Sequence, residues 1–169
     1  MRKNALFTGI LILAALGAHW TFQGRDRSIA APRKGVVQTM DLRIAAQYAK
    51  KKNVVILLAF HDASCPYCDQ MEEEVLIPMA ADKANRKRVI IRKIMSGSTI
   101  RDFQGKKIAA SAFAQRYGST FTPTLFFLDH GGKELTEKIV GISNAEYISY
   151  YVEQAVKKAL RRLRRSSRG

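Results

Sequence analysis

Cysteine is scarce in this chain: its 169 residues include only two. Two cysteines are too few for a scaffold held together by several disulfides. They also cannot by themselves supply the four ligands that a zinc site usually needs. Three interpretations remain open at this point: a redox pair, a metal-binding pair helped by histidine or methionine, and an incidental structural disulfide.

Acidic residues are also few, 14 against 29 basic residues, so the formal net charge is +15. Such a surface attracts anions, including nucleic acid, anionic lipid and acidic proteins. The sequence lacks a stripe of interleaved aromatic and basic residues, and we therefore favour a solvated surface and expect no nucleic-acid partner. The hydrophobic content of 47% and the length are sufficient for one domain with a hydrophobic core.

A long apolar run occurs only near the N-terminus. Arg2 and Lys3 precede an apolar stretch over residues 5–18 that contains several small residues. This order is typical of a cleaved signal peptide, and an uncleaved membrane anchor that extends to residue 22 satisfies the same pattern. Residues 1–22 are thus a signal peptide or an N-terminal anchor, and the anchor would attach the chain to a membrane. Either interpretation places the remaining domain outside the cytoplasm, for example in a periplasm.

The rest of the chain divides into a linker over residues 23–38, a domain over residues 39–160 and a basic C-terminal tail over residues 161–169, expected to be frayed and solvated. Expected helices cover 39–53, 65–76, 108–117 and 143–160, and expected strands cover 54–60, 89–94, 124–128 and 134–140. Pro78 should break the second helix and start another turn, and Ser143 with Glu146 should form a capping box for the last one. This order predicts an α/β fold in which helices flank a central mixed β-sheet, with an extra segment between its second and third strands.

The two cysteines form the motif Cys65-Pro66-Tyr67-Cys68, directly after an apolar strand and at the start of an expected helix. A helix N-terminus favours a thiolate through its free N–H groups, so Cys65 is the candidate nucleophile and Cys68 the candidate resolving thiol. Pro66 suits the first turn of a helix, where its missing N–H costs nothing. Tyr67 is expected at the exposed tip, within reach of a partner.

A second signal is Thr122-Pro123, which stands immediately before the apolar strand expected over residues 124–128. Only about 5–6% of X-Pro bonds in folded proteins are cis, so the dipeptide alone does not predict one. An ordinary proline at the start of a strand is the simpler interpretation of the dipeptide by itself.

Taken together, these motifs resemble the thioredoxin-fold superfamily over about residues 41–160. The likeness rests on the cysteine motif after a hydrophobic strand, Thr122-Pro123-Thr124 before a closing hairpin, and Gly141 before a terminal helix. Residues 60–65, 72–76 and 121–127, and the long segment between the second and third strands, look most like exported thioredoxin-like proteins of the kind found with bacterial sulfur oxidation (SoxW-like).

The resemblance implies a thiol–disulfide oxidoreductase in which Cys65 and Cys68 form a redox-active disulfide. It further implies that Pro123 is cis and faces the pair, and that the backbone of Thr122 pairs with an extended substrate segment. The expected partners are protein thiols and disulfides and a redox partner that the sequence does not identify, with no dissociable cofactor and no metal. The direction of exchange is not readable from the two residues between the cysteines.

One position departs from the pattern of that superfamily. Thioredoxins carry a buried acid six residues before the nucleophile, and this chain has Ala59 there. Asp62 in the following loop is a candidate substitute, although a loop acid is more often solvated. His61 would favour the thiolate if it were protonated, and otherwise it is a loop histidine without a role.

Two other functions compete with thiol–disulfide exchange. A thioredoxin-like copper-binding protein or metallochaperone would bind Cu(I) through the two thiolates with His61, His130 or Met71. Alternatively, the basic tail would make the chain a non-catalytic module that binds a membrane surface or a partner.

Overall fold

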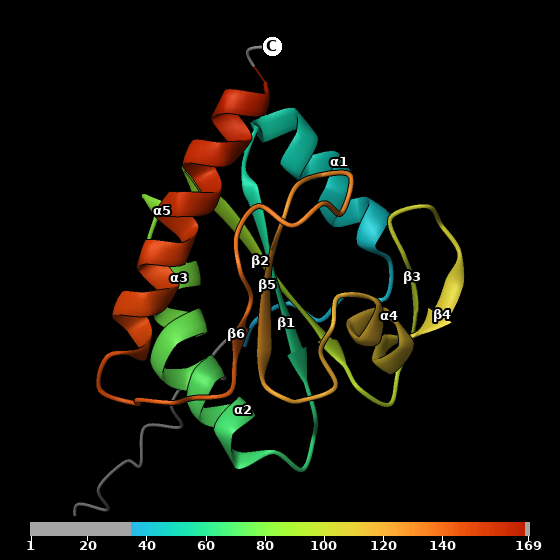
Figure 1. Cartoon of the computed structure of the whole chain (residues 1–169), viewed down its shortest axis with the longest axis vertical. Coiled ribbons are helices and arrows are strands. Elements are labelled where there is room, and N and C mark those ends of the chain that lie inside the picture. Colours follow the sequence, from blue (N-terminus) through green and yellow to red (C-terminus); the bar gives the residue numbers. More distant parts are fainter. Residues whose placement is uncertain (1–34, 168–169) are drawn as a thin grey trace, which may run out of the picture. The chain divides into compact units, whose positions relative to one another are not determined.

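The computed structural model describes residues 35–167, and its centre is a four-stranded mixed sheet (Figure 1). The strand order is β2-β1-β5-β6, in which β1 pairs parallel with β2 and antiparallel with β5, and β5 pairs antiparallel with β6. The strands are β1 (Val55–His61), β2 (Val89–Met95), β5 (Thr124–Leu128) and β6 (Ile139–Val140). This sheet confirms the predicted α/β fold class.

Helices cover both faces of the sheet, so the central strand β1 is buried along its whole length. Alternate side chains of β1 enter two separate cores: Leu57 packs on one face and Ile56 on the other. Each fully buried side chain of this size stabilises the fold by about 1.5–3 kcal/mol. The apolar run on which the central strand was predicted is therefore explained by burial on both faces.

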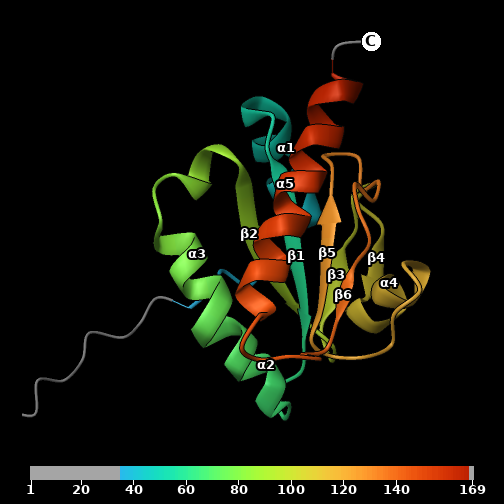
Figure 2. The ribbon, with the colours of Figure 1, turned by 60° about the vertical axis from the view of Figure 1, so that its left-hand side comes forward.

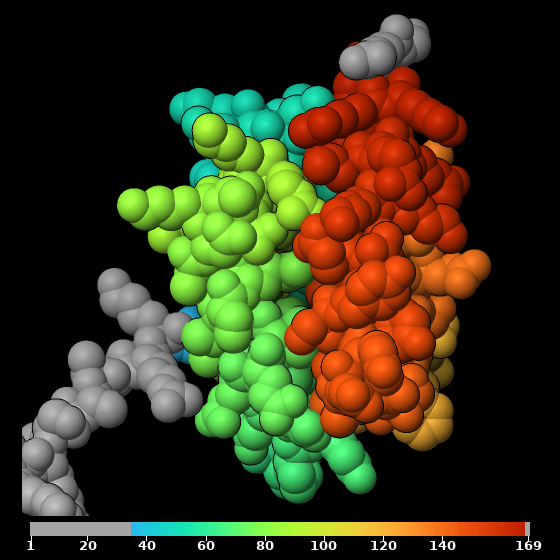
Figure 3. All heavy atoms as spheres, turned by 90° about the vertical axis from the view of Figure 1, so that its left-hand side faces the viewer, coloured from blue at the N-terminus to red at the C-terminus, as the bar shows by residue number. Residues whose placement is uncertain are grey.

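The first face carries α5 (Ile148–Ser166) and the helical segment formed by α2 (Pro66–Met71), a π-helical turn (Glu72–Leu76) and α3 (Ile77–Ala81). These two helical segments lie side by side (Figures 2 and 3). The opposite face carries α1 (Leu42–Lys52) and α4 (Ala110–Arg116).

Pro78 starts a further helical turn, as expected, but it does not break the helical segment that follows the cysteines. The π-turn precedes the proline, and in it the Ile77 N–H donates to the carbonyl of Glu72. Pro78 then lies in the first turn of α3, where a missing N–H is tolerated. The wide turn also carries Glu72, whose side chain is buried.

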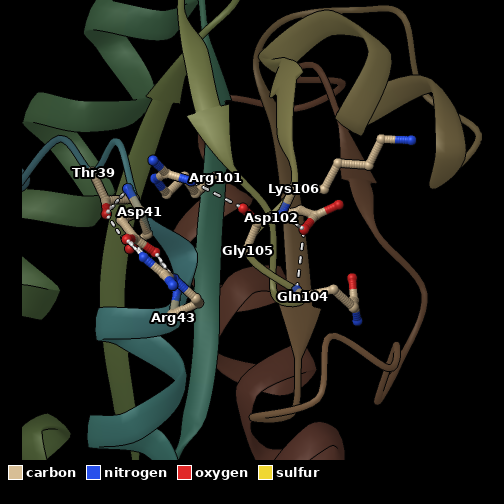
Figure 4. A network of polar contacts seen from close by, with 8 residues as sticks. All are labelled: Thr39, Asp41, Arg43, Arg101, Asp102, Gln104, Gly105 and Lys106. Atoms are coloured by element: carbon tan, nitrogen blue, oxygen red, sulfur yellow. Dashed lines mark hydrogen bonds and ion pairs between the residues drawn. The ribbon is translucent and has the colours of Figure 1, made fainter.

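The segment between the second and third core strands contains a separate hairpin of β3 (Thr99–Arg101) and β4 (Lys107–Ala109), followed by α4. The buried Asp102 carboxylate accepts hydrogen bonds from the N–H groups of Gln104 and Lys106 and thereby shapes the turn (Figure 4). Gly105 completes the turn with a φ of +84°, which favours glycine. The predicted extra segment is thus an ordered element.

The N-terminal boundary of the domain differs from the prediction. Asp41, and not Thr39, caps α1, since its carboxylate accepts from the Arg43 N–H (Figure 4). Val36 lies in the expected linker, yet its side chain is buried in the core. The backbone of Lys93 in β2 bonds to the chain on both sides of residue 38, through Val37 and Thr39.

The C-terminal part shows three further differences. The expected strand over 134–140 is reduced to β6 and an isolated bridge between Glu134 and Leu128. The expected capping box is wrong, because α5 begins only at Ile148 and Asn144 accepts the Glu146 N–H instead. The expected frayed tail is helical through Ser166, with Leu163 buried against the core.

The segment expected to be a signal peptide or anchor, residues 1–22, lies outside the described residues. Among residues 35–167, the structure contains no helix that is both long and apolar enough to cross a membrane.

Candidate active site

The cysteine motif lies between the end of β1 and the start of the helical segment on the first face of the sheet. Cys65 is the N-cap of α2, and its sulfur accepts the Cys68 N–H at 3.2 Å. Pro66 occupies the first turn of the helix, as the sequence predicts. The sulfur atoms of Cys65 and Cys68 are joined in a disulfide, with Cα atoms 5.2 Å apart.

The two cysteines differ sharply in exposure. Cys65 is partly exposed, whereas Cys68 is 0% exposed. Pro66 and Tyr67 between them lie at the surface, and Tyr67 is 61% exposed. A partner molecule can therefore reach the sulfur of Cys65 but not that of Cys68.

The loop before β5 lies against the disulfide. The carbonyl oxygen of Thr122 is 3.6 Å from the sulfur of Cys65, and the Thr122–Pro123 peptide bond is cis. Pro123 is buried and its carbonyl accepts the Gly141 N–H, which ties the loop to the segment after β6. Phe121 at the edge of this loop is 70% exposed.

Asp62 is not a substitute for a buried acid. Its carboxylate accepts hydrogen bonds from the N–H and hydroxyl of Ser64 and from the hydroxyl of Ser96. These hydrogen bonds lower the pKa of Asp62 to about 2. The group therefore stays ionised near neutral pH, and its role is to fix the loop that leads to Cys65.

A buried acid is nevertheless present, on the helix instead of the strand. Ala59 is paired in register with Lys93 of β2, and the Lys93 ammonium bonds both carboxylate oxygens of Glu72 at 2.6 and 2.8 Å. The same carboxylate accepts the Val36 N–H at 2.8 Å. Sequence reasoning considered only the strand and the loop before Cys65, and therefore missed Glu72. The available signal was that Glu72 follows Cys68 by four residues, which puts both on one helix face.

His61 belongs to β1 and is not a loop residue, as one of the two expectations had it. Its side chain is buried, with Nδ1 3.6 Å from the carboxylate of Glu72. Burial lowers the pKa of His61 below its ordinary value of 6.5, an effect that outweighs the opposing influence of Glu72. Burial therefore disfavours the protonated form in which His61 would favour the thiolate.

The side chains suggested as copper ligands lie in different environments. Met71, the last residue of α2, is fully buried in the core. His130 is exposed after the far end of β5, the opposite end of the strand from Thr124 beside the disulfide. Within residues 35–167 no group of three or more His, Cys, Asp or Glu side chains is placed to hold a metal ion.

Comparison with known proteins gives one family match: residues 42–156 match the model of the thioredoxin-like domain. A thioredoxin h mutant from poplar has a TM-score of 0.51 at 16% identity and covers 73% of this chain and 85% of its own. Thioredoxin from Nicotiana alata has a TM-score of 0.47 at 22% identity, covering 71% of this chain and 94% of its own. The search of curated proteins found no match. At these identities, the poplar structure supports the fold alone.

The buried His61 predicts a specific dependence of stability on pH. Its pKa is lower in the folded chain than in the unfolded chain, so the unfolded chain binds more protons at mildly acidic pH. The stability associated with neutral His61 is complete above about pH 6.5 and is lost as the pH falls through the folded-state pKa, by at most about 1.4 kcal/mol per pH unit.

Urea unfolding of the wild type and of His61→Leu between pH 7.5 and pH 5 should show this loss in the wild type only. His130→Leu removes an exposed imidazole and should behave like the wild type. Identical pH dependence in the wild type and in His61→Leu would contradict the assignment.

Proposed function

This chain belongs to the thioredoxin-like domain family, and on that basis we propose that it is a thiol–disulfide oxidoreductase acting on protein disulfides outside the cytoplasm. The observation that carries the proposal is the arrangement of the pair. A partly exposed Cys65 caps a helix and forms a disulfide with a buried Cys68. A redox couple needs one sulfur that a partner can attack and a second that closes behind it.

In the reaction, electrons and protons pass between thiols without a dissociable cofactor. When the pair acts as reductant, the Cys65 thiolate attacks a substrate disulfide, and one substrate sulfur leaves as thiolate and takes up a proton. The Cys68 thiolate then attacks the sulfur of Cys65, breaks the mixed disulfide and releases the second substrate sulfur. Two electrons reach the substrate, and the reverse sequence oxidises it. The direction depends on the reduction potential, for which 30 mV corresponds to about 1.4 kcal/mol.

The surface around Cys65 suits a polypeptide partner. The carbonyl of Thr122 lies beside the reactive sulfur, where an extended segment can add to the backbone as a strand does. Two exposed aromatic residues neighbour these groups in the sequence, Tyr67 within the cysteine motif and Phe121 directly before Thr122. Exposed aromatic groups of this kind often anchor a protein partner.

The extracytoplasmic location rests on the sequence of residues 1–22 and on the likeness to exported SoxW-like proteins. In an oxidising compartment the pair would exchange electrons with a separate redox partner. Recovery of the native chain in the cytoplasmic fraction of its cell would contradict the location without touching the chemistry.

Separate roles for the two cysteines predict different failures of the two serine variants. Cys65→Ser removes the attacking sulfur, so turnover of a protein disulfide should fall by at least about 10³-fold. Cys68→Ser should still attack but should accumulate a mixed disulfide with the substrate, visible in the intact mass. Retained turnover in Cys65→Ser would overturn the proposed function.

If Tyr67 and Phe121 anchor a protein partner, replacing them should lower the rate with protein disulfides more than the rate with small disulfides. Phe121→Ala and Tyr67→Ala should each lower kcat/KM for a protein disulfide by about 5- to 30-fold, which corresponds to about 1–2 kcal/mol. The rate with a small aromatic disulfide should change less than about twofold. Tyr48→Ala, on α1 at the opposite face of the sheet, is the matched control. Equal losses with both kinds of substrate would argue against a docking role.

A further inference from the structure

The proposed role of Cys68 requires that a buried thiol lose its proton. To resolve a mixed disulfide it must act as a thiolate, yet a free thiol has a pKa of about 8.5 and apolar surroundings raise it further. The side chain is 0% exposed, so bulk water does not reach it directly. A buried base near the first turns of the helix would solve this problem.

Glu72 is the centre of a charged cluster, with Lys93 and His61, beside the first turns of this helix. It follows Cys68 by one helical turn, and its backbone N–H donates to the Cys68 carbonyl. Both side chains are buried on the inner face of the helical segment. The carboxylate of Glu72 is held by the Lys93 ammonium and the Val36 N–H. Both carboxylate oxygens of Glu72 therefore already have hydrogen-bond donors.

His61 is the group in this cluster that still has an atom available to accept a proton. It is 2% exposed, and Nε2 is a buried atom without a hydrogen-bond partner in the described part of the chain. The Glu72 carboxylate 3.6 Å from Nδ1 favours a proton on Nδ1, which leaves the lone pair on Nε2. Buried polar atoms are rarely left unpaired, and a redox or catalytic role is one reason for such an exception.

The redox state of the pair offers an explanation for the unpaired atom. In the disulfide the sulfur of Cys68 carries no proton, so it has no hydrogen to donate. In the mixed disulfide with a substrate, Cys68 carries an S–H group. Because Cys68 lies one helical turn before Glu72, which faces the same imidazole, this S–H group would supply the donor that Nε2 lacks. Ala59 lies two residues before His61 on the same face of β1. Its side chain is only a methyl group, so it adds no polar group there.

A route to solvent is also present. A recess in the surface is lined by Asp69, Glu72, Glu73, Ile77, Lys93 and Gly35. It reaches the Glu72–Lys93 ion pair from the outside. The charged groups that face His61 are Glu72 on the π-turn, Lys93 on β2 and Asp69 on α2, and all three act on its titration. Glu72 thus both faces the imidazole of His61 and lines a recess that opens to water.

We propose that His61, oriented by the Glu72–Lys93 ion pair, is the buried base that takes the proton from Cys68 when the mixed disulfide on Cys65 resolves. This inference rests on the proposed thiol–disulfide exchange. In the step, the Cys68 S–H bond breaks and its proton goes to Nε2. The Cys68 sulfur bonds to the Cys65 sulfur, the bond between Cys65 and the substrate sulfur breaks, and the substrate sulfur leaves as a thiolate with the electron pair of that bond. The proton then passes to water, and the neutral imidazole is restored.

The test separates the two chemical steps in the full chain. Reduced protein is mixed with 5,5′-dithiobis(2-nitrobenzoate), which releases one coloured thiolate when Cys65 attacks and a second when Cys68 resolves the mixed disulfide. In His61→Leu the second phase should slow at least about tenfold at pH 6.5 and recover as the pH approaches the ordinary thiol pKa. The first phase should change less than about twofold.

Matched controls are His130→Leu, which removes an exposed histidine, and Glu74→Gln, an exposed neighbour of Glu72. Both should leave the two phases unchanged. An unchanged second phase in His61→Leu, or equal slowing of both phases, overturns the role of His61. A wild type that shows no second phase contradicts the proposed function itself, so the two failures are distinguishable.

A second measurement needs no variant and therefore does not depend on whether His61→Leu folds. The pKa of the His61 imidazole is measured by NMR in the oxidised and in the reduced wild type. Because proton and electron binding are linked when the groups interact, the pKa should differ between the two forms. The same pKa in both forms would overturn the proposal.

Discussion

The burial of β1 on both faces is the constraint on which the rest of this structure depends. Its seven residues pair with a strand on each edge and pack beneath helices on each side. A strand held in this way has little freedom, so the position of its last residue, His61, is fixed. The short loop to Cys65 is fixed in turn by the hydrogen bonds to Asp62. The position of the partly exposed Cys65 thus depends on the apolar packing of β1, several residues earlier in the chain.

The neighbour of β1 in the sheet also explains why the charges of Glu72 and Lys93 are tolerated beside α2 and the π-turn. Ala59 leaves no carboxylate on β1, but its neighbour in the sheet is Lys93, which reaches Glu72 from the adjoining strand. Burying an ion pair costs desolvation free energy, which is offset only when the geometry is good and the remaining donors and acceptors are satisfied. Glu72 meets that condition through Lys93 and Val36. A buried acid thus lies one helical turn after Cys68, on the helical segment and not on β1.

Much of this arrangement could be predicted from the sequence, where the pattern was strong and local. The continuous apolar run predicted β1, and the cysteine motif with Pro66 predicted the start of the helix. The inward position of Glu72 could not be foreseen from the strand pattern, and Pro78 argued against a continuous helix. A π-turn accommodates both, and it depends on packing instead of on local propensity.

Tertiary packing also overrode local signals at the ends of the chain. Ser143 and Glu146 have the spacing of a capping box, yet α5 begins at Ile148. The arginine-rich tail looked solvated, but Leu163 gives its helix an apolar contact with the core. Val36 likewise joined the core from a segment without periodicity.

A reversible redox couple and a structural disulfide differ in reduction potential, and we propose that Cys65 and Cys68 are the former. The potential is measured most directly as the fraction of disulfide after equilibration in a series of thiol–disulfide buffers, with thiols trapped and counted by mass. We expect one reversible two-electron transition with a midpoint between about −270 and −120 mV, the range of thioredoxin-fold oxidoreductases. A midpoint below about −300 mV, where structural disulfides lie, would contradict it.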